Sequence, residues 1–152
     1  PSMLSADAAA KAITEAFEKG EPSLENLWKM HRLYHEAYGA KQAGLDVLRI
    51  YLQKLSSADL DFVIEKKIVT DEELAEMGYR GELVSAVISK TMRALKLLSR
   101  PSLLKELVQV KNYMDKARKL YLNYPESPEG FEKWYSEQKK LFDEVKRKYA
   151  KP

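Results

Sequence analysis

The sequence contains no cysteine, which excludes disulfide bonds, thiolate metal sites and cysteine nucleophiles. No apolar run approaches the roughly 20 residues that a membrane-spanning helix needs. The start of the chain also lacks the basic and then apolar order of a signal peptide. We therefore expect a cytoplasmic protein whose contact with a membrane is at most peripheral.

Neither sign of charge dominates the composition. Lys and Arg number 26 and Asp and Glu number 23, so the formal net charge is +3. Such a small excess does not indicate a nucleic-acid partner, whose mark is a concentrated basic surface. Hydrophobic residues make up 45% of the 152 residues and charged residues 32%. This balance excludes a disordered chain and leaves enough apolar surface for a core.

Familiar catalytic and cofactor-binding motifs are also missing. The sequence has no Gly-rich phosphate loop, no G-x-S-x-G turn and no G-x-G-x-x-G dinucleotide fingerprint. We therefore predict no catalytic residue in this chain. Because it begins with Pro1-Ser2 and has no initiator Met, we expect it to be a processed or cut piece.

Apolar residues follow a helical spacing almost throughout, and no segment alternates strictly enough to be a strand. The first predicted helix has a stripe of six apolar residues: Ala8, Ala9, Ala12, Ile13, Ala16 and Phe17. Gly20 and Pro22 stop this helix.

A second helix is predicted to follow Ser23, whose side chain can cap it. One side of this helix carries Leu24, Leu27, Trp28, His31, Tyr34 and Tyr38. Gly39 and Gly44 each cost about 1 kcal/mol against Ala in a helix, so we expect a kink or short break near them. The period then resumes with Leu45, Leu48, Leu52 and Leu55.

Capping and turn residues mark the middle of the chain. Ser56-Ser57 opens a short helix, and the segment Thr70-Asp71-Glu72-Glu73 has the spacing of a capping box. Gly78 and Gly81 bracket a predicted turn, and a further helix is predicted over residues 82–99.

Two long helices complete the chain. Pro101 ends the preceding helix and Ser102 caps the next, whose stripe alternates steps of four and three. This seam consists of Leu103, Leu107, Val110, Met114, Ala117, Tyr121 and Tyr124, and we interpret it as a packing face in a bundle. A turn follows, with Ser127 as N-cap and Pro128 at the first position of the last helix. We predict an all-α fold in which residues 1–152 form a single domain, an irregular bundle of six or seven helices.

His31 and His35, the two histidines, are four residues apart, so a helix places them on one face. This spacing can hold a transition metal, but a site needs further ligands, and only Glu36 lies nearby. The H-E-x-x-H order of zinc proteases is not met. We therefore predict no metal site and interpret the pair as one histidine at the edge of the core and one in solvent.

Acidic residues cluster at Asp59, Asp61 and Glu65 and again between residues 71 and 76. Paired carboxylates support acid–base catalysis only where burial separates their pKa values. The second cluster lies in a predicted first helical turn, where acids favour the helix dipole. We therefore assign catalysis to neither cluster.

A basic segment with interleaved aromatic residues ends the chain, with cations at Lys139, Lys140, Lys146, Arg147, Lys148 and Lys151. Such a segment can contact the phosphates of a nucleic acid or of a lipid surface. Cations in a last helical turn also complement the dipole, and Asp143 and Glu144 dilute the charge. We favour a solvated face.

More specific features occupy the first third of the chain. Pro1-Ser2-Met3-Leu4-Ser5 is followed by an Ala-rich run at 8–13, an acidic linker at 18–24 and an aromatic helix that reaches Tyr38-Gly39-Ala40-Lys41. This order resembles the geranylgeranyl reductase family, in which a Gly-rich turn runs into G-P-S-M-L-S and an Ala-rich helix just after the second flavin-contacting motif. Beyond residue 55 the likeness is one of helical character and length only.

The resemblance implies that the chain is the C-terminal helical part of a longer FAD-dependent enzyme that reduces isoprenoid double bonds of membrane-lipid precursors. Residues 1–20 would be the flavin-facing helix, and residues 21–152 the C-terminal helical region. Pro1, Ser2 and Met3 would then be the cofactor-binding residues, where the free amides of a helix start face the flavin. The partner would be the isoprenoid lipid substrate of the parent enzyme. The apolar stripes are broad enough to line a tunnel for its chain, but packing of the helices on one another accounts for most of these stripes.

The sequence departs from the family in important ways. It lacks the G-x-G-x-x-G, the Gly-rich turn before Pro1 and the substrate-recognition sheet, and Ala6-Asp7 replaces an expected Gly and apolar residue. We therefore expect neither FAD binding nor catalysis by this chain alone. The alternative is a freestanding helical interaction or scaffold module that self-associates through the seam at 103–124. A piece of a larger enzyme should instead expose an apolar face and self-associate through that face.

Overall fold

The computed structural model describes residues 2–80 and 97–149, and every element in them is helical. The elements are α1 (Ser2–Glu18), α2 (Leu24–Leu27), α3 (Lys29–Tyr34), the π-helix η1 (His35–Gly39), α4 (Ala40–Lys54), α5 (Ser57–Glu65), α6 (Asp71–Arg80), α9 (Pro101–Leu122), the 3-10 helix η2 (Pro128–Gly130) and α10 (Phe131–Tyr149). The all-α prediction is confirmed. Gly81 and most of the predicted helix at 82–99 lie outside the described residues.

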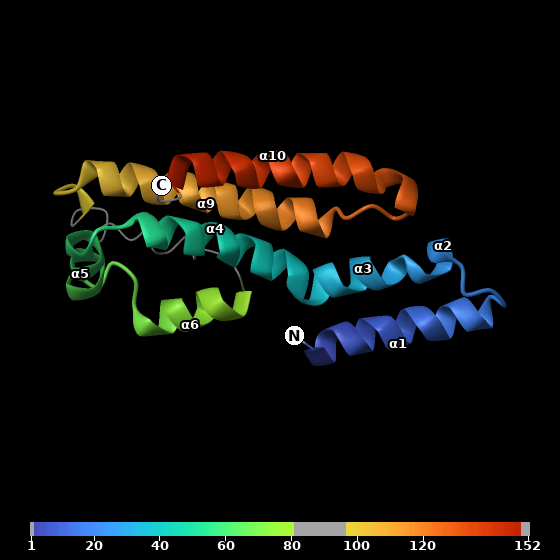
Figure 1. Cartoon of the computed structure of the whole chain (residues 1–152). Coiled ribbons are helices and arrows are strands. Elements are labelled where there is room, and N and C mark those ends of the chain that lie inside the picture. The colour runs from blue at the N-terminus through green and yellow to red at the C-terminus, as the bar shows by residue number, and fades with distance from the viewer. Residues whose placement is uncertain (1, 81–96, 150–152) are drawn as a thin grey trace.

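The helices α2, α3, η1 and α4 follow one another as a single broken rod, and two layers of helices lie along it (Figure 1). On one side α9 runs antiparallel to α4, and α10 returns alongside α9. On the other side α1 packs antiparallel to α3, while α5 and α6 lie beyond and beside α4. With the rod counted as one helix, the described residues form six helices, within the predicted number.

The core lies where α4, α9 and α10 meet. Fully or nearly fully buried residues from α4 are Ala43, Val47, Ile50 and Tyr51, and those from α9 and α10 are Leu103, Leu107, Val110, Met114, Ala117, Phe142, Val145 and Tyr149. The predicted stripe of Leu45, Leu48, Leu52 and Leu55 is only partly buried. Leu55 lies in the core, but Leu52 is exposed and Leu45 and Leu48 are half buried. The α9 stripe is a packing face in a bundle, as predicted.

Burial of the α9 seam bears on the alternative that the chain is a freestanding interaction module, which would self-associate through this seam. Of its seven residues, all except Tyr121 are buried within the molecule. Self-association through Leu103–Tyr124 would require α9 to leave α4 and α10. The seam is therefore not exposed on the surface of the described part of the molecule.

The first helix is attached by small side chains. Ala8, Ala12 and Ala16 recur every four residues and are buried against the α2–α3 segment, which lets the two backbones approach closely. The other half of the predicted stripe is not buried, because Ile13 and Phe17 point outward and are exposed. At the end of α1, Gly20 has φ +83, a left-handed conformation that glycine adopts without strain.

Three predicted caps are confirmed. The Ser23 hydroxyl accepts from the Asn26 amide, and Ser56 caps α5. Thr70 and Glu73 form the reciprocal capping box, with Glu73 N–H donating to Thr70 Oγ1 at 3.3 Å and Thr70 N–H donating to Glu73 Oε2 at 3.0 Å. Capping residues were therefore reliable guides to three helix starts.

Other boundary predictions were wrong. Pro101 begins α9 at its first position, with Arg100 as N-cap, so Ser102 lies inside the helix. Proline suits this position because its missing N–H would be unpaired there in any case. Gly78 lies within α6 rather than in a turn. Ser127 does precede a helix with Pro128 first, but that helix is the 3-10 turn η2, which leads into α10.

Replacing Ser56 by Ala is expected to lower the free energy of unfolding by about 1 kcal/mol. Ser56 Oγ accepts from the Asp59 amide at 3.1 Å and donates to Asp59 Oδ2 at 2.7 Å, so the variant leaves a first-turn amide without its cap. Urea unfolding measures the loss. Ser57→Ala, at the exposed first helical position, is the matched control and should change stability by less than about 0.5 kcal/mol. Equal stability of both variants would contradict the cap.

Candidate functional site

Aromatic rings from two distant parts of the sequence converge at the start of the rod. This aromatic cluster comprises Trp28, His31, His35, Tyr121, Tyr124, Phe131 and Trp134. Tyr124 is its centre, with ring centroids 5.6 Å from Trp28, 4.7 Å from His35 and 4.8 Å from Trp134. Stacked and edge-on pairs at such distances each contribute about 0.5–1.5 kcal/mol beyond burial. The cluster joins α3 and η1 to the α9–α10 turn.

His35 begins the π-helix η1, where the helix contains one wide turn. π-turns are uncommon and occur frequently at functional sites. Tyr121 lies edge-on to the His35 ring at 5.0 Å, and Trp134 lies at 6.0 Å. His35 Nδ1 is buried and has no hydrogen-bond partner among the described residues. The predicted break at Gly39 is therefore confirmed as a π-turn, whereas Gly44 lies inside regular α4.

Gly39 is close to this ring. A Cβ atom added at Gly39 would collide with His35 Nδ1 and lie 3.1 Å from Cε1 of the same ring. Gly39 itself has φ −61 and ψ −39, values that any residue adopts. Glycine is therefore needed here for space rather than for backbone conformation.

Beside His35 the surface is hollowed into a groove of about 440 Å³, which we call the η1 groove. Its aromatic walls are Tyr34, Tyr121 and Phe142, its polar residues are Gln42, Asp46, Gln138 and Lys146, and His35, Gly39 and Ala43 complete the lining. Five elements supply these residues: α3, η1, α4, α9 and α10. A groove of this size, with aromatic walls and a few convergent polar groups, suits a small polar ligand.

Some polar residues of the groove have hydrogen-bond or ion-pair partners, and others have none among the described residues. Arg49 binds Asp46 with both Nε and a terminal nitrogen 2.7 Å from Oδ1, so the carboxylate charge is compensated. Gln138 Nε2 donates to the Tyr121 hydroxyl at 3.3 Å, and burial raises the pKa of Tyr121. Neither Gln42 nor Lys146 has a hydrogen bond or ion pair with any residue in 2–80 or 97–149. The groove therefore offers one amide and one cation to a ligand.

The free energy of unfolding is expected to decrease as the pH is lowered from 6.5 to about 4, the range in which His35 is protonated in the unfolded chain but not in the folded one. Burial, and to a smaller extent the charge of His31, lowers the pKa of His35 from 6.5 to about 4. Above pH 6.5 the ring is neutral in both states; between 6.5 and about 4 the unfolded chain takes up a proton that the folded chain does not. Because the ring is partly exposed, we expect a loss of roughly 1 kcal/mol.

Urea unfolding at successive pH values measures this loss. His35→Phe should remove it, so that the stability difference between wild type and variant changes between pH 6.5 and about 4. His31→Gln, at an exposed ring, should retain most of it. Parallel stability profiles for wild type and His35→Phe would contradict a buried neutral His35.

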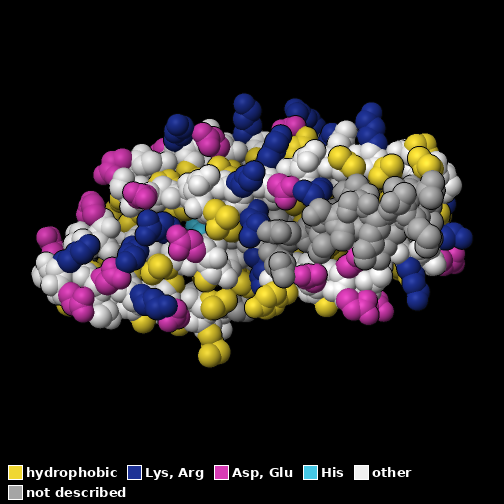
Figure 2. All heavy atoms as spheres, turned by 180° about the vertical axis from the view of Figure 1, so that it is seen from behind, with side chains coloured by type: hydrophobic (Ala, Val, Ile, Leu, Met, Phe, Trp, Pro, Cys, Tyr) yellow, Lys and Arg dark blue, Asp and Glu magenta, His cyan; other side chains and the backbone are white. Residues whose placement is uncertain are grey.

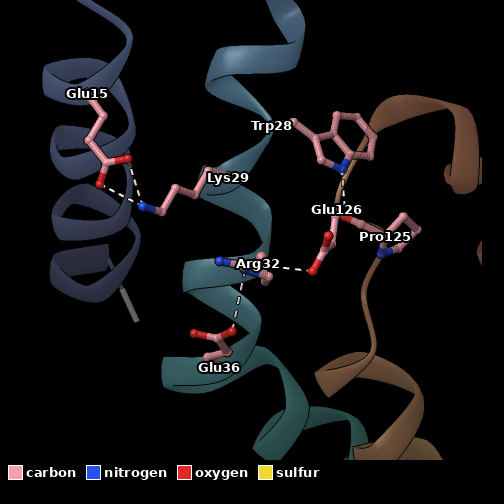
Figure 3. A network of polar contacts seen from close by, with 7 residues as sticks. All are labelled: Glu15, Trp28, Lys29, Arg32, Glu36, Pro125 and Glu126. Atoms are coloured by element: carbon pink, nitrogen blue, oxygen red, sulfur yellow. Dashed lines mark hydrogen bonds and ion pairs between the residues drawn. The ribbon is translucent and has the colours of Figure 1, made fainter. Parts of the chain in front are cut away.

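Next to the aromatic cluster a polar network connects three segments (Figure 3). Lys29 of α3 donates to both carboxylate oxygens of Glu15 in α1 at 2.7 Å. The indole N–H of Trp28 donates to the Pro125 carbonyl at 2.8 Å, and Arg32 reaches Glu126 at 3.4 Å. The network thus holds α1 and the loop before η2 to the same short stretch of rod.

The predicted cofactor-binding residues lie away from the groove. Pro1 is outside the described residues, and Ser2 and Met3 form the exposed first turn of α1. That turn carries no acidic residue, so its amides are not screened by a carboxylate. Five of the best-formed cavities have no lining residue from α1. The structure therefore does not bring Ser2 and Met3 together with His35 or with any concave surface among these.

The other sequence candidates have structural roles. His31 is exposed and His35 is half buried, as predicted for the pair. No three His, Asp or Glu side chains in the described ranges are grouped as a metal site. Asp59 is paired with Arg100, and hydrogen bonds from Ser56 and then Arg100 lower its pKa. In the basic segment Lys139 pairs with Asp143 at 2.5 Å, while Lys151 lies outside the described residues.

Sequence reasoning missed the η1 groove. Its walls combine residues about 100 positions apart, and nothing in the spacing of Tyr34 or His35 predicts that Tyr121 and Gln138 lie beside them. The available signal was the high density of aromatic residues at 28–38 and 121–135, which could have indicated that the two segments meet.

No helix in the described part of the chain is long and apolar enough to span a membrane. Comparison with known proteins gives no matching family model. It does give a relative, the digeranylgeranylglycerophospholipid reductase of Sulfolobus acidocaldarius, to which the chain is 47% identical over 135 residues. The match covers 89% of this chain and 30% of the relative. The predicted resemblance to a geranylgeranyl reductase is thus confirmed over most of the chain, which spans about 30% of the length of that reductase.

Proposed function

We propose that this chain is the C-terminal helical part of an FAD-dependent geranylgeranyl reductase of membrane-lipid synthesis and does not catalyse the reaction by itself. The proposal is supported chiefly by the 47% identity over 89% of the chain. Its fragment character is supported by the 30% share of the relative that the match covers. The substrate would be a glycerophospholipid bearing two geranylgeranyl chains, as the name of the relative describes.

The outward face of α1 supports the idea of a missing partner surface. Its large apolar residues, together with the neighbouring Leu24, are exposed: Met3, Leu4, Ile13, Phe17 and Leu24. Figure 2 shows several hydrophobic side chains near the middle of the lower edge of the molecule, with acidic and basic side chains on either side of them, whereas lysines and arginines stand out along the upper edge. Exposed large apolar residues that gather on one helix face usually mark an interface. In our proposal this face packs on the rest of the enzyme.

In our proposal the described residues do not hold FAD by themselves. The start of α1 provides free amides that could face an electron-rich group, but it lies on an exposed surface with no cradle around it. Most contacts to a flavin would therefore come from other parts of the enzyme. We derive no hydride-transfer step from this chain.

The isoprenoid chains of the lipid would also lie elsewhere than in a tunnel lined by the apolar stripes. The apolar stripes of α4, α9 and α10 pack on one another in the core, so they do not line a tunnel among the described residues. Of the large apolar surfaces, the α1 face remains available. An isoprenoid chain in contact with this part of the enzyme would lie near α1 or in the η1 groove.

The native polypeptide tests the proposal. We expect the gene to encode a chain of several hundred residues with a Gly-rich stretch before Pro1, and the purified native protein to show flavin absorbance. A native protein of 17.5 kDa without colour would overturn the proposal. That result would leave the freestanding helical interaction module as the answer.

The isolated 152-residue chain is expected to self-associate through the α1 face. Phe17 is 64% exposed there, and Phe17→Glu should shift the population toward the monomer in light scattering. Ile64, 69% exposed on α5, is the matched control, and Ile64→Glu should leave the association unchanged. A wild-type chain that is strictly monomeric and binds no apolar dye would count against a missing enzyme surface.

A further inference from the structure

We propose that the η1 groove binds the phosphate-bearing glycerol headgroup of the lipid, an inference that rests on the proposed function and assigns one part of the substrate to this chain. The groove lies beside the π-turn at His35 and combines aromatic walls, two amide side chains and one cation.

The charge of the groove favours a ligand with a single anionic group. Lys146 is exposed at its rim and forms no ion pair or hydrogen bond within residues 2–80 and 97–149. Asp46 would repel an anion, but Arg49 lies against its carboxylate at 2.7 Å and compensates that charge. Lys146 is thus the cation left to meet the phosphate group of a ligand.

The hydrogen-bonding groups of the groove match a polyol phosphate. The amide of Gln42 has no partner among the described residues, and Gln138 uses one N–H to reach the Tyr121 hydroxyl. Each amide side chain can donate to a phosphate oxygen and accept from a glycerol hydroxyl. The second ring nitrogen of His35, Nε2, also has no hydrogen-bond partner in residues 2–80 and 97–149, and unlike Nδ1 it is not among the fully buried atoms. A neutral imidazole can give or accept one further bond there.

The lining of the groove suits a ligand that has both polar and apolar surface. Tyr34, Tyr121 and Phe142 present ring surface to the C–H groups of a glycerol backbone. The volume of about 440 Å³ lies within the range of small-molecule sites. Because the groove is open to the surface, acyl or isoprenoid chains attached to the glycerol can leave it without passing through the core.

Calorimetric titration of the 152-residue chain with glycerol 1-phosphate tests the proposal. We expect saturable binding that Lys146→Gln weakens by tenfold or more. Lys140→Gln is the matched control, because Lys140 is an exposed lysine of the same helix that lines a different depression. It should retain wild-type binding. A second variant, Gln42→Leu with Gln138→Leu, should also weaken binding by tenfold or more, with circular dichroism confirming that it remains folded.

Two results would overturn the headgroup site. Equal losses for Lys146→Gln and Lys140→Gln would show a diffuse charge effect, and inorganic phosphate binding as tightly as glycerol 1-phosphate would show that the glycerol is not recognised. The source of the headgroup is distinguished with dihexanoyl phosphatidylglycerol below its micelle concentration. Tighter binding than glycerol 1-phosphate identifies a lipid, and equal binding identifies a free polyol phosphate; either result supports the shared chemistry.

The headgroup site and the reductase proposal can fail separately. A native flavoprotein of several hundred residues whose KM for the lipid is unchanged by Lys146→Gln would refute the site and leave the reductase standing. Glycerol phosphate binding by a colourless native protein of 17.5 kDa would support the site and refute the reductase.

Discussion

Replacement of Trp28 by Ala is expected to lower the free energy of unfolding by about 3–5 kcal/mol. The indole is 8% exposed and stacks on Tyr124 at 5.6 Å, with Phe131 edge-on at 5.9 Å. Its N–H donates to the Pro125 carbonyl at 2.8 Å. The variant would lose the buried ring area and leave a cavity between the rod and the α9–α10 turn. Urea unfolding followed by circular dichroism measures the loss.

Two further variants separate the contributions of Trp28. Trp28→Phe keeps most of the ring contacts but removes the hydrogen bond to Pro125, so it should cost about 1–2 kcal/mol. Tyr135→Ala removes an aromatic residue of α10 that is 47% exposed, and should cost less than about 1 kcal/mol. If Trp28→Ala were no more destabilising than Tyr135→Ala, the aromatic cluster would not hold the two segments together.

The sequence shows only in part why the rod near Trp28 meets the α9–α10 turn. The cap residues Ser23, Ser56 and Thr70 act on amides three positions away, so their effect is local and could be predicted. The periodic stripe of α9 likewise predicted which face is buried. Pairing of Trp28 with Tyr124 and Pro125 spans about 100 positions. No local pattern encodes it.

The split stripe of α1 shows why apolar spacing alone does not identify a buried face. Alanines and larger residues alternate along one broad stripe, and the structure buries the alanines while Ile13 and Phe17 remain exposed. Close approach of α1 to α3 favours the smaller side chains. Periodicity predicted the helix correctly, but which half of its stripe faces the neighbour depended on packing.

The candidate site was predicted in a different place from the groove. Ser2 and Met3 were assigned from the family resemblance, and the η1 groove was not predicted because it depends on the π-turn. A π-turn shifts the register of all later side chains on a helix, so its location depends on which residues must fit against α9 and α10. The glycine at position 39 predicted a break in the helix. It did not show that the His35 ring occupies the space in which a side chain at this position would lie.

Gly39→Ala is expected to lower the free energy of unfolding by about 2 kcal/mol. Alanine gains about 1 kcal/mol of helix propensity over glycine, but overpacking a filled site costs up to about 3 kcal/mol. The new methyl would collide with the His35 ring. That ring cannot swing aside freely, because Tyr124 lies 4.7 Å and Tyr121 5.0 Å from it. Gly78→Ala is the matched control, because no atom of the described residues lies within 4 Å of the added Cβ, and it should stabilise the chain by about 0.5–1 kcal/mol.

A double-mutant cycle identifies the atoms responsible. His35→Ala removes the ring, so Gly39→Ala introduced into that background should be neutral or stabilising, and the coupling between the two sites should be about 2–3 kcal/mol. Because Gly39 has φ −61, no left-handed backbone conformation opposes alanine there. An equal cost of Gly39→Ala with and without the ring would contradict the steric argument and show that the π-turn backbone itself requires glycine. A strong coupling would instead show that the glycine is needed so that the histidine ring can pack beside it, with its edge on the groove.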